Sequence, residues 1–274
     1  MILLLLGACS SIMQSATNDI ADNLSTAILN QNDPETVRDG APAYLLMLDS
    51  FIQGSPDNPR MLAAAAELYA AYGVIFVEDA ERADRLTNRA LDYALRSVCA
   101  SNRSACDFDK LSFKEFETVL QAMGKKDVAS LFTYGLTASA YIKVHSSDWG
   151  AMAKLPRVES VLRRVQALDP QHKPVQVEHF LAVLNTIRPP ALGGNFEEGK
   201  RHYERALELS NGKDLSINVD YARFYARTLY DRELHDQLLN DVLSAEPNQE
   251  GYTLFNTLAQ REAQELLLSA DEYF

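Results

Sequence analysis

Two arginines lie one helical turn apart in a tyrosine-rich segment, where they could bind an organic anion. After Asp220 the sequence runs Tyr-Ala-Arg-Phe-Tyr-Ala-Arg, so Arg223 and Arg227 flank Tyr225. Guanidinium groups give charge-assisted hydrogen bonds, and aromatic rings line ligand sites. The alternative, which we favour, is a charge ladder of i,i+3 and i,i+4 pairs from Asp220 to Asp231, as repeat helices usually carry. Arg223, Tyr225 and Arg227 are therefore the candidate ligand or partner contacts.

Two cysteines lie seven residues apart and could form either a disulfide or part of a metal site. Cys99 and Cys106 enclose Ala-Ser-Asn-Arg-Ser-Ala. Zinc needs four ligands, and no histidine falls between or close to this pair. We therefore predict a disulfide formed in an oxidising compartment. Because the closed loop is short, its stabilisation should lie at the low end of the few kcal/mol typical of disulfides.

No pattern in the rest of the chain is typical of catalysis. The five histidines are His145, His172, His179, His202 and His235, and none forms a metal-binding pair with the spacing of a protease helix. There is no Gly-x-Ser-x-Gly elbow and no phosphate-binding glycine-rich loop. Gly193-Gly194 follows two prolines and precedes a capped helix, which favours a connection between repeats over an anion-binding nest. We predict that the protein is not an enzyme, needs no cofactor and holds no metal.

The first ten residues resemble a bacterial lipoprotein signal. Leu6-Gly7-Ala8-Cys9 follows an apolar run, and cleavage before a lipidated cysteine would leave Cys9 as the first mature residue. No Lys or Arg precedes Cys9, although a secretory signal begins with positive charge, so we expect the true start upstream. The residue after the cysteine is Ser10 and not the aspartate that retains lipoproteins at the inner membrane. This favours attachment to the outer membrane, facing the periplasm. The alternative is a short apolar segment that packs onto the first helix.

The formal net charge of −12 excludes one class of partner. Nucleic-acid binding requires a basic face that displaces counterions from phosphates. The same charge opposes attraction to anionic lipid surfaces. Membrane attachment is therefore expected only through the acyl chains on Cys9, which bury enough methylene groups to hold a domain.

A recurring triplet indicates helical-hairpin repeats. Gly199, Tyr203 and Ala206 have the small-aromatic-small spacing of the second helix of a tetratricopeptide unit. Degenerate copies begin at Ala83, Val158 and His235, and the separations are near one or two multiples of the roughly 34-residue period. The full copies are Ala83, Thr87, Ala90; Val158, Leu162, Val165; and His235, Leu239, Val242.

The remaining patterns predict an all-α chain in one continuous domain. Sustained period-two alternation is missing, and no linker composition interrupts the chain. We predict a signal segment at 1–8, an acylated tether at 9–15 and a tetratricopeptide (TPR)-like helical-hairpin solenoid, or superhelix, over 16–274. Caps are expected at Asn58, Ser112 and Asn195. The predicted helices are 16–31, 34–53, 59–77, 80–98, 112–123, 126–144, 155–169, 173–187, 195–210, 214–230, 231–245 and 251–270.

Several stretches together resemble the T component of TRAP transporters (TatT). They are the lipoprotein-type Cys9, Pro189-Pro-Ala-Leu-Gly-Gly, Tyr203-Glu-Arg-Ala-Leu-Glu-Leu-Ser, the Tyr221 segment, Asp231-Arg-Glu-Leu-His-Asp-Gln-Leu-Leu, and Asn256-Thr-Leu-Ala-Gln-Arg-Glu-Ala through Tyr273-Phe274. The resemblance covers most of the mature chain and is strongest after Trp149.

This resemblance implies a partner protein in a tripartite, ATP-independent periplasmic transporter. It implies a periplasmic lipoprotein that binds the transporter's solute-binding protein, self-associates as a homo-oligomer with a trimer as the expected form, and takes up a hydrophobic or organic-acid ligand. Two other classes stay open. A general scaffold of outer-membrane protein assembly would bind a β-barrel complex, and a carrier of apolar ligands would retain its ligand through purification.

Overall fold

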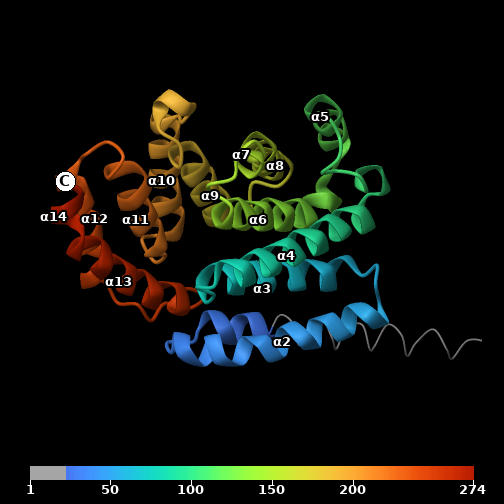
Figure 1. Cartoon of the computed structure of the whole chain (residues 1–274), viewed down its shortest axis with the longest axis horizontal. Coiled ribbons are helices and arrows are strands. Elements are labelled where there is room, and N and C mark those ends of the chain that lie inside the picture. The colour runs from blue at the N-terminus through green and yellow to red at the C-terminus, as the bar shows by residue number, and fades with distance from the viewer. Residues whose placement is uncertain (1–22) are drawn as a thin grey trace, which may run out of the picture.

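The structure, a computed structural model, describes residues 23–274, and every regular element in this range is helical (Figure 1). After a helical stretch at 23–29, the elements follow in this order: α2 (Pro34–Gly54), α3 (Pro59–Ile75), α4 (Ala80–Ser101), η1 (Arg103–Ala105), α5 (Phe113–Ala122), η2 (Lys125–Asp127), α6 (Val128–Val144), α7 (Trp149–Met152), α8 (Leu155–Leu168), α9 (Pro174–Thr186), η3 (Pro190–Leu192), α10 (Phe196–Ser210), α11 (Ser216–Asp220), η4 (Tyr221–Ala226), α12 (Arg232–Ser244), α13 (Thr253–Leu268) and α14 (Ala270–Tyr273). The prediction of an all-α chain is confirmed for these residues.

The three predicted N-cap residues each lie at the start of the expected helix. Asn58 Oδ1 accepts the backbone N–H groups of the first turn of α3. Ser112 and Glu115 form a reciprocal capping box at the start of α5, and Asn195 accepts from Glu198 at the start of α10. Each side chain satisfies amide groups that have no partner within the helix.

The prediction of one continuous α-helix over 214–230 is wrong. Only α11 is a regular helix there, and η4 is a π-helix in which the N–H of Arg227 donates to the carbonyl of Ala222 at 3.0 Å. A π turn adds one residue to a helical turn, and hydrophobic periodicity cannot show such an insertion. The four-residue helices α7 and α14 were also not predicted, because they are too short to show a period.

The predicted triplets are buried, and glycine sets the closest helix contacts. All twelve triplet residues lie in the interior. An ideal Cβ on Gly199 of α10 would lie 2.4 Å from Thr186 Cγ2 of α9. One on Gly135 of α6 would lie 2.9 Å from Leu162 Cδ2 of α8. Only a residue without Cβ allows these helices to approach so closely.

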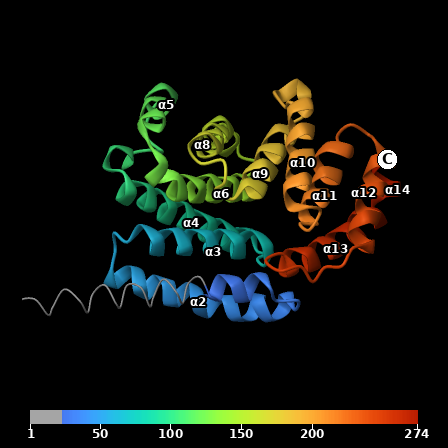
Figure 2. The same ribbon diagram turned by 180° about the vertical axis from the view of Figure 1, so that it is seen from behind.

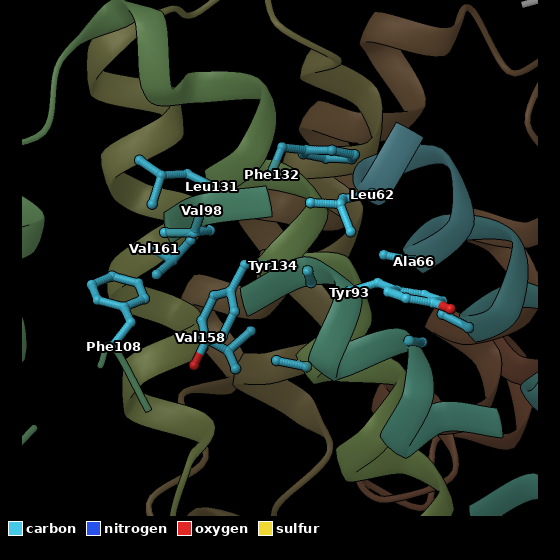
Figure 3. Close-up of a cluster of buried hydrophobic side chains, with 14 of the residues drawn as sticks. Leu62, Ala66, Tyr93, Val98, Phe108, Leu131, Phe132, Tyr134, Val158 and Val161 are labelled. Atoms are coloured by element: carbon cyan, nitrogen blue, oxygen red, sulfur yellow. The ribbon is translucent and has the colours of Figure 1, made fainter. Parts of the chain in front are cut away.

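Two clusters of buried apolar residues share α9. Val177, Leu181 and Leu184 of α9 belong to the larger cluster with residues of α2 to α8. Val175 and Ala182 belong to the second cluster, with residues of α10 to α13. Figure 3 shows part of the larger cluster, where side chains from α3, α4, α6 and α8 meet. Because α9 contributes to both, it joins the two halves; the single domain over 16–274 stays a prediction.

Buried asparagine Asn256 of α13 fixes the loop before α11 and the loop after α12. Its Oδ1 accepts from the backbone N–H of Leu215 at 2.9 Å. Its Nδ2 donates to the carbonyls of Lys213 at 2.8 Å and Pro247 at 3.2 Å. The fully buried amide therefore has partners on both sides, as burial of a polar group requires.

Helix α13, near the C-terminal end of the chain, meets α2 near the N-terminal end, so the row of helices curves back on itself (Figures 1 and 2). Arg261 of α13 pairs with both carboxylate oxygens of Glu35 of α2, at 2.6 and 3.1 Å. Nearby, the backbone N–H of Gly251 donates to Asn30 Oδ1 at 2.7 Å. The TPR-like superhelical arrangement stays a prediction.

Within residues 23–274, no helix combines the length and the apolar character needed to cross a bilayer. Cys9, the signal segment at 1–8 and the tether at 9–15 lie outside the described residues.

Candidate functional site

Arg223 of η4 and Arg227, the residue that follows η4, project toward the last two long helices. Arg223 forms an ion pair with Glu262 of α13. Arg227 Nη2 donates to the carbonyl of Leu266 and to Ser269 Oγ, both at 2.7 Å. Both arginines therefore join η4 to the end of the helical row.

The predicted ladder of ion pairs along one helix is wrong at these positions. Asp220 Oδ2 lies 2.9 Å from Nε2 of His179 of α9. Asp231 instead caps α12, where it accepts the backbone N–H of Leu234 at 3.0 Å. The acids and the arginines of this segment thus make their contacts with different helices.

The His179–Asp220 contact favours the charged form of each side chain. Burial disfavours both charged forms, but the hydrogen bond and mutual attraction outweigh it, so the pKa of His179 is raised and that of Asp220 is lowered. The hydroxyl of Tyr203 donates to the carbonyl of Asp220 at 3.2 Å. The start of η4 is therefore held by α9 and α10 together.

Tyr225 lies on another side of η4, in a row of buried rings. Its ring centre is 5.6 Å from that of Phe196 and 5.1 Å from that of Tyr221. Tyr221 in turn stacks on Tyr203 at 4.6 Å. Burial raises the pKa of Tyr225. Tyr225 therefore packs against α10 while the arginines pack against α13, so the three predicted residues do not converge on one site. Their contact with a ligand or partner stays a prediction.

The sequence did not indicate an exposed aromatic pair that lies beside Arg227; we call Arg223 and Arg227 the arginine hub. The aromatic patch is defined as Tyr230 and Tyr273 together with Leu229 and Leu268, which lie close to them along the chain; in chain order Leu229, Tyr230, Leu268 and Tyr273 are 44%, 70%, 78% and 41% exposed. The ring centres of Tyr230 and Tyr273 are 5.8 Å apart, and the Arg227 guanidinium lies 4.7 Å from the centre of the Tyr273 ring. The hub thus holds the rings in place, and exposed aromatic side chains on a rigid support are typical of protein interfaces.

Four of the five histidines pair with a carboxylate. His145 pairs with Asp84, His179 with Asp220, His202 with Glu178 and His235 with Asp236. Within residues 23–274, no group of three His, Cys, Asp or Glu side chains is placed to bind a metal ion. Sequence spacing could not reveal these pairs, because most join different helices.

Cys99 and Cys106 form a disulfide that ties the end of α4 to the loop before α5, with 4.2 Å between their Cα atoms. Nearby, Asn102 Nδ2 donates to the buried Asp127 Oδ2 at 3.3 Å. The disulfide therefore constrains only the short segment between Cys99 and Cys106. It is far along the sequence from the hub and the patch.

Comparison with known families gives one match over most of the chain. The model of a family described as TRAP transporter T-component matches residues 30–274. A comparison with curated proteins found no match.

Proposed function

Because this chain belongs to the TRAP transporter T-component family, we propose that it acts without catalysis as a periplasmic partner of the transporter's solute-binding protein. The family match carries this proposal, since it spans nearly every described helix. As a component of a transporter, the chain works with other proteins, and a rigid set of packed helices provides a surface for them.

We further propose that the helix pairs are degenerate tetratricopeptide units. The buried triplets and the close contact at Gly199 support this, because small residues at the helix crossing are the basis of that packing. Acylation of Cys9, attachment to the outer membrane and assembly as a trimer belong to the same proposal and follow from the family resemblance.

We place the contact with the solute-binding protein on the aromatic patch. Its four side chains expose large apolar surface where charged residues would be favoured in an isolated protein. Tyr230 contributes most, because its ring is 70% exposed and rests on Tyr273. Tyrosine rings lose little conformational entropy on binding and often dominate interface energetics.

Affinity purification from gently solubilised envelopes tests the partner. An epitope inserted at the exposed Ser146–Ser147 turn leaves the aromatic patch free. Mass spectrometry should recover a periplasmic solute-binding protein with the full-length chain. Recovery of β-barrel assembly components instead would assign the chain to envelope scaffolding and overturn the proposal.

The variant Tyr230→Asn tests the surface without harming the fold. Tyr230 has a φ of 57°, a left-handed conformation that asparagine adopts more readily than tyrosine. We expect the variant to fold normally and to lose at least about tenfold in affinity for the recovered partner. Phe113→Ala, at a 48% exposed ring on α5, is the matched control and should bind normally. Equal binding by both variants would exclude the patch as the contact.

A further inference from the structure

A cavity of about 250 Å³ lies among α4, α6 and the start of α8, away from the hub and the patch. Its lining includes the buried Tyr134 and Ala138, whereas Asp109 and Ala153 are exposed. The cavity therefore has a floor in the protein interior and a mouth at the surface. Its size suits a small organic molecule.

One face of α6 supplies an apolar and aromatic wall. Tyr134, Ala138 and Tyr141 follow one another at i, i+4 and i+7, which places them on one side of the helix. Leu91 of α4 lies opposite and also lines the cavity. The small side chain of Ala138 leaves the space between the two rings.

Two cations line the cavity without a carboxylate partner. Lys154 Nζ lies 4.8 Å from the centre of the Tyr141 ring, and no carboxylate of the described chain is within 4.0 Å of it. Arg157 donates to the carbonyls of Phe108 and Leu111, which are neutral acceptors. These positive charges are notable in a chain of net charge −12. An anion bound in the cavity would supply the negatively charged partner that Lys154 and Arg157 lack within the described chain.

The floor holds a polar group that lacks a partner. Tyr134 is 3% exposed, and its hydroxyl makes no hydrogen bond with residues 23–274. Burial raises its pKa to about 12, so it remains a neutral donor. This hydroxyl is not sealed from solvent, and its residue lines the cavity, so it is free to donate to a molecule bound there.

The start of α8 brings both cations to the cavity. Lys154 is the residue before α8, and Arg157 lies in the first turn of this helix. At the mouth, Asp109 carries the opposite charge and would repel a second acidic group.

We propose that this cavity binds a small monocarboxylate with a flat apolar body, held by Lys154 and Arg157 at the carboxylate and by Tyr134 and Tyr141 at the rings. The site deepens the proposed function, since it gives the expected organic-acid ligand a place in the chain. It does not depend on which protein the aromatic patch binds.

Isothermal titration of the purified protein with benzoate tests the site. We expect one saturable site with a dissociation constant between about 10 µM and about 1 mM, a range suited to a ligand of this size. Benzyl alcohol, which keeps the ring and lacks the charge, should bind at least about tenfold more weakly. Absence of saturable binding up to about 10 mM benzoate, or equal binding of both compounds, would overturn the proposal.

Two variants distinguish benzoate binding in the cavity from nonspecific benzoate binding. Lys154→Met removes one cation whose only described contact is with a ring, and should weaken benzoate binding at least about tenfold. Ala138→Leu fills the floor and should abolish binding in a protein that still folds. Lys200→Met, at an exposed position on α10, is the control. Binding by Lys154→Met as tight as by Lys200→Met would refute the role of the cation.

The two proposals fail separately. If benzoate does not bind while the solute-binding protein is still captured, only the cavity assignment falls. If benzoate binds but no such protein is captured, the ligand site stands and the transporter partnership falls.

Discussion

Replacing Gly199 with alanine should destabilise the fold, although alanine is the better helix former. The new Cβ would lie 2.4 Å from Thr186 Cγ2, so the two atoms must separate by about 1 Å to reach ordinary contact at 3.4 Å. Thr186 cannot rotate away freely, because its Oγ1 donates to the carbonyl of Ala182 at 2.9 Å and contacts Tyr203 Oη at 3.2 Å. Helices α9 and α10 must therefore move apart.

The magnitude follows from two opposing effects. Overpacking of a well-packed core costs about 1–3 kcal/mol, and the fixed rotamer of Thr186 places this site at the upper end. The higher helix propensity of alanine in a helix interior raises the free energy of unfolding by about 1 kcal/mol. We therefore expect Gly199→Ala to lower the free energy of unfolding by about 2 kcal/mol.

Urea unfolding followed by circular dichroism measures this difference. Gly40→Ala in α2 is the matched control, since no atom lies within 4 Å of its added Cβ, and it should be stabilising by about 0.5–1 kcal/mol. Thr186→Ser removes the clashing methyl group and keeps the hydroxyl. Combined with Gly199→Ala, it should restore most of the lost stability. If Gly199→Ala is as stable as the parent, or the serine gives no rescue, the close-contact argument is refuted.

Three further perturbations test other contacts. Asn256→Ala leaves the N–H of Leu215 and the carbonyl of Lys213 without partners, whereas the carbonyl of Pro247 keeps the N–H of Gln249, so we expect the free energy of unfolding to fall by about 2–4 kcal/mol in the same urea assay. Asp220 raises the pKa of His179 above 6.5, so the contribution of His179 is fully present below that pH and is lost as pH rises through the folded-state pKa. The stability difference between the parent and His179→Gln should therefore shrink as the pH rises above about 6.5; an unchanged difference would contradict the charged pair. Serine at both Cys99 and Cys106 should cost about 2 kcal/mol, as expected for a loop of this length, and a thermal shift of zero would argue against the bridge.

Helix positions could be predicted because their determinants are local. Asn58 and Ser112 mark helix starts through contacts within three residues, so the sequence contains all the necessary information. The burial of the triplets was also predictable, since a face with a 3.6-residue period must turn toward a neighbour. These features establish the helices and the sides that they bury.

The site could not be predicted in the same way, because its contacts join distant segments. Arg223 and Asp220 have a spacing that suits a helical pair, yet each finds a partner on another helix. The π turn changes the direction of the side chains after Asp220, and no single residue type signals it. The cavity was missed for a similar reason, since Tyr134 and Lys154 meet only after α6 and α8 pack together.

The meeting of the two chain ends follows from helix packing more than from the ion pair that spans it. Arg261 lowers the pKa of Glu35 to about 2, chiefly through its hydrogen bond, yet both side chains are about half exposed. Exposed pairs of this kind contribute little, because water and salt screen them. The curvature that brings α13 to α2 must come instead from the contacts along the row, and the close approach of α9 and α10 at Gly199 is one of them. The family match begins at Asn30, the residue that accepts the hydrogen bond from Gly251. The matched region therefore includes both partners of this contact.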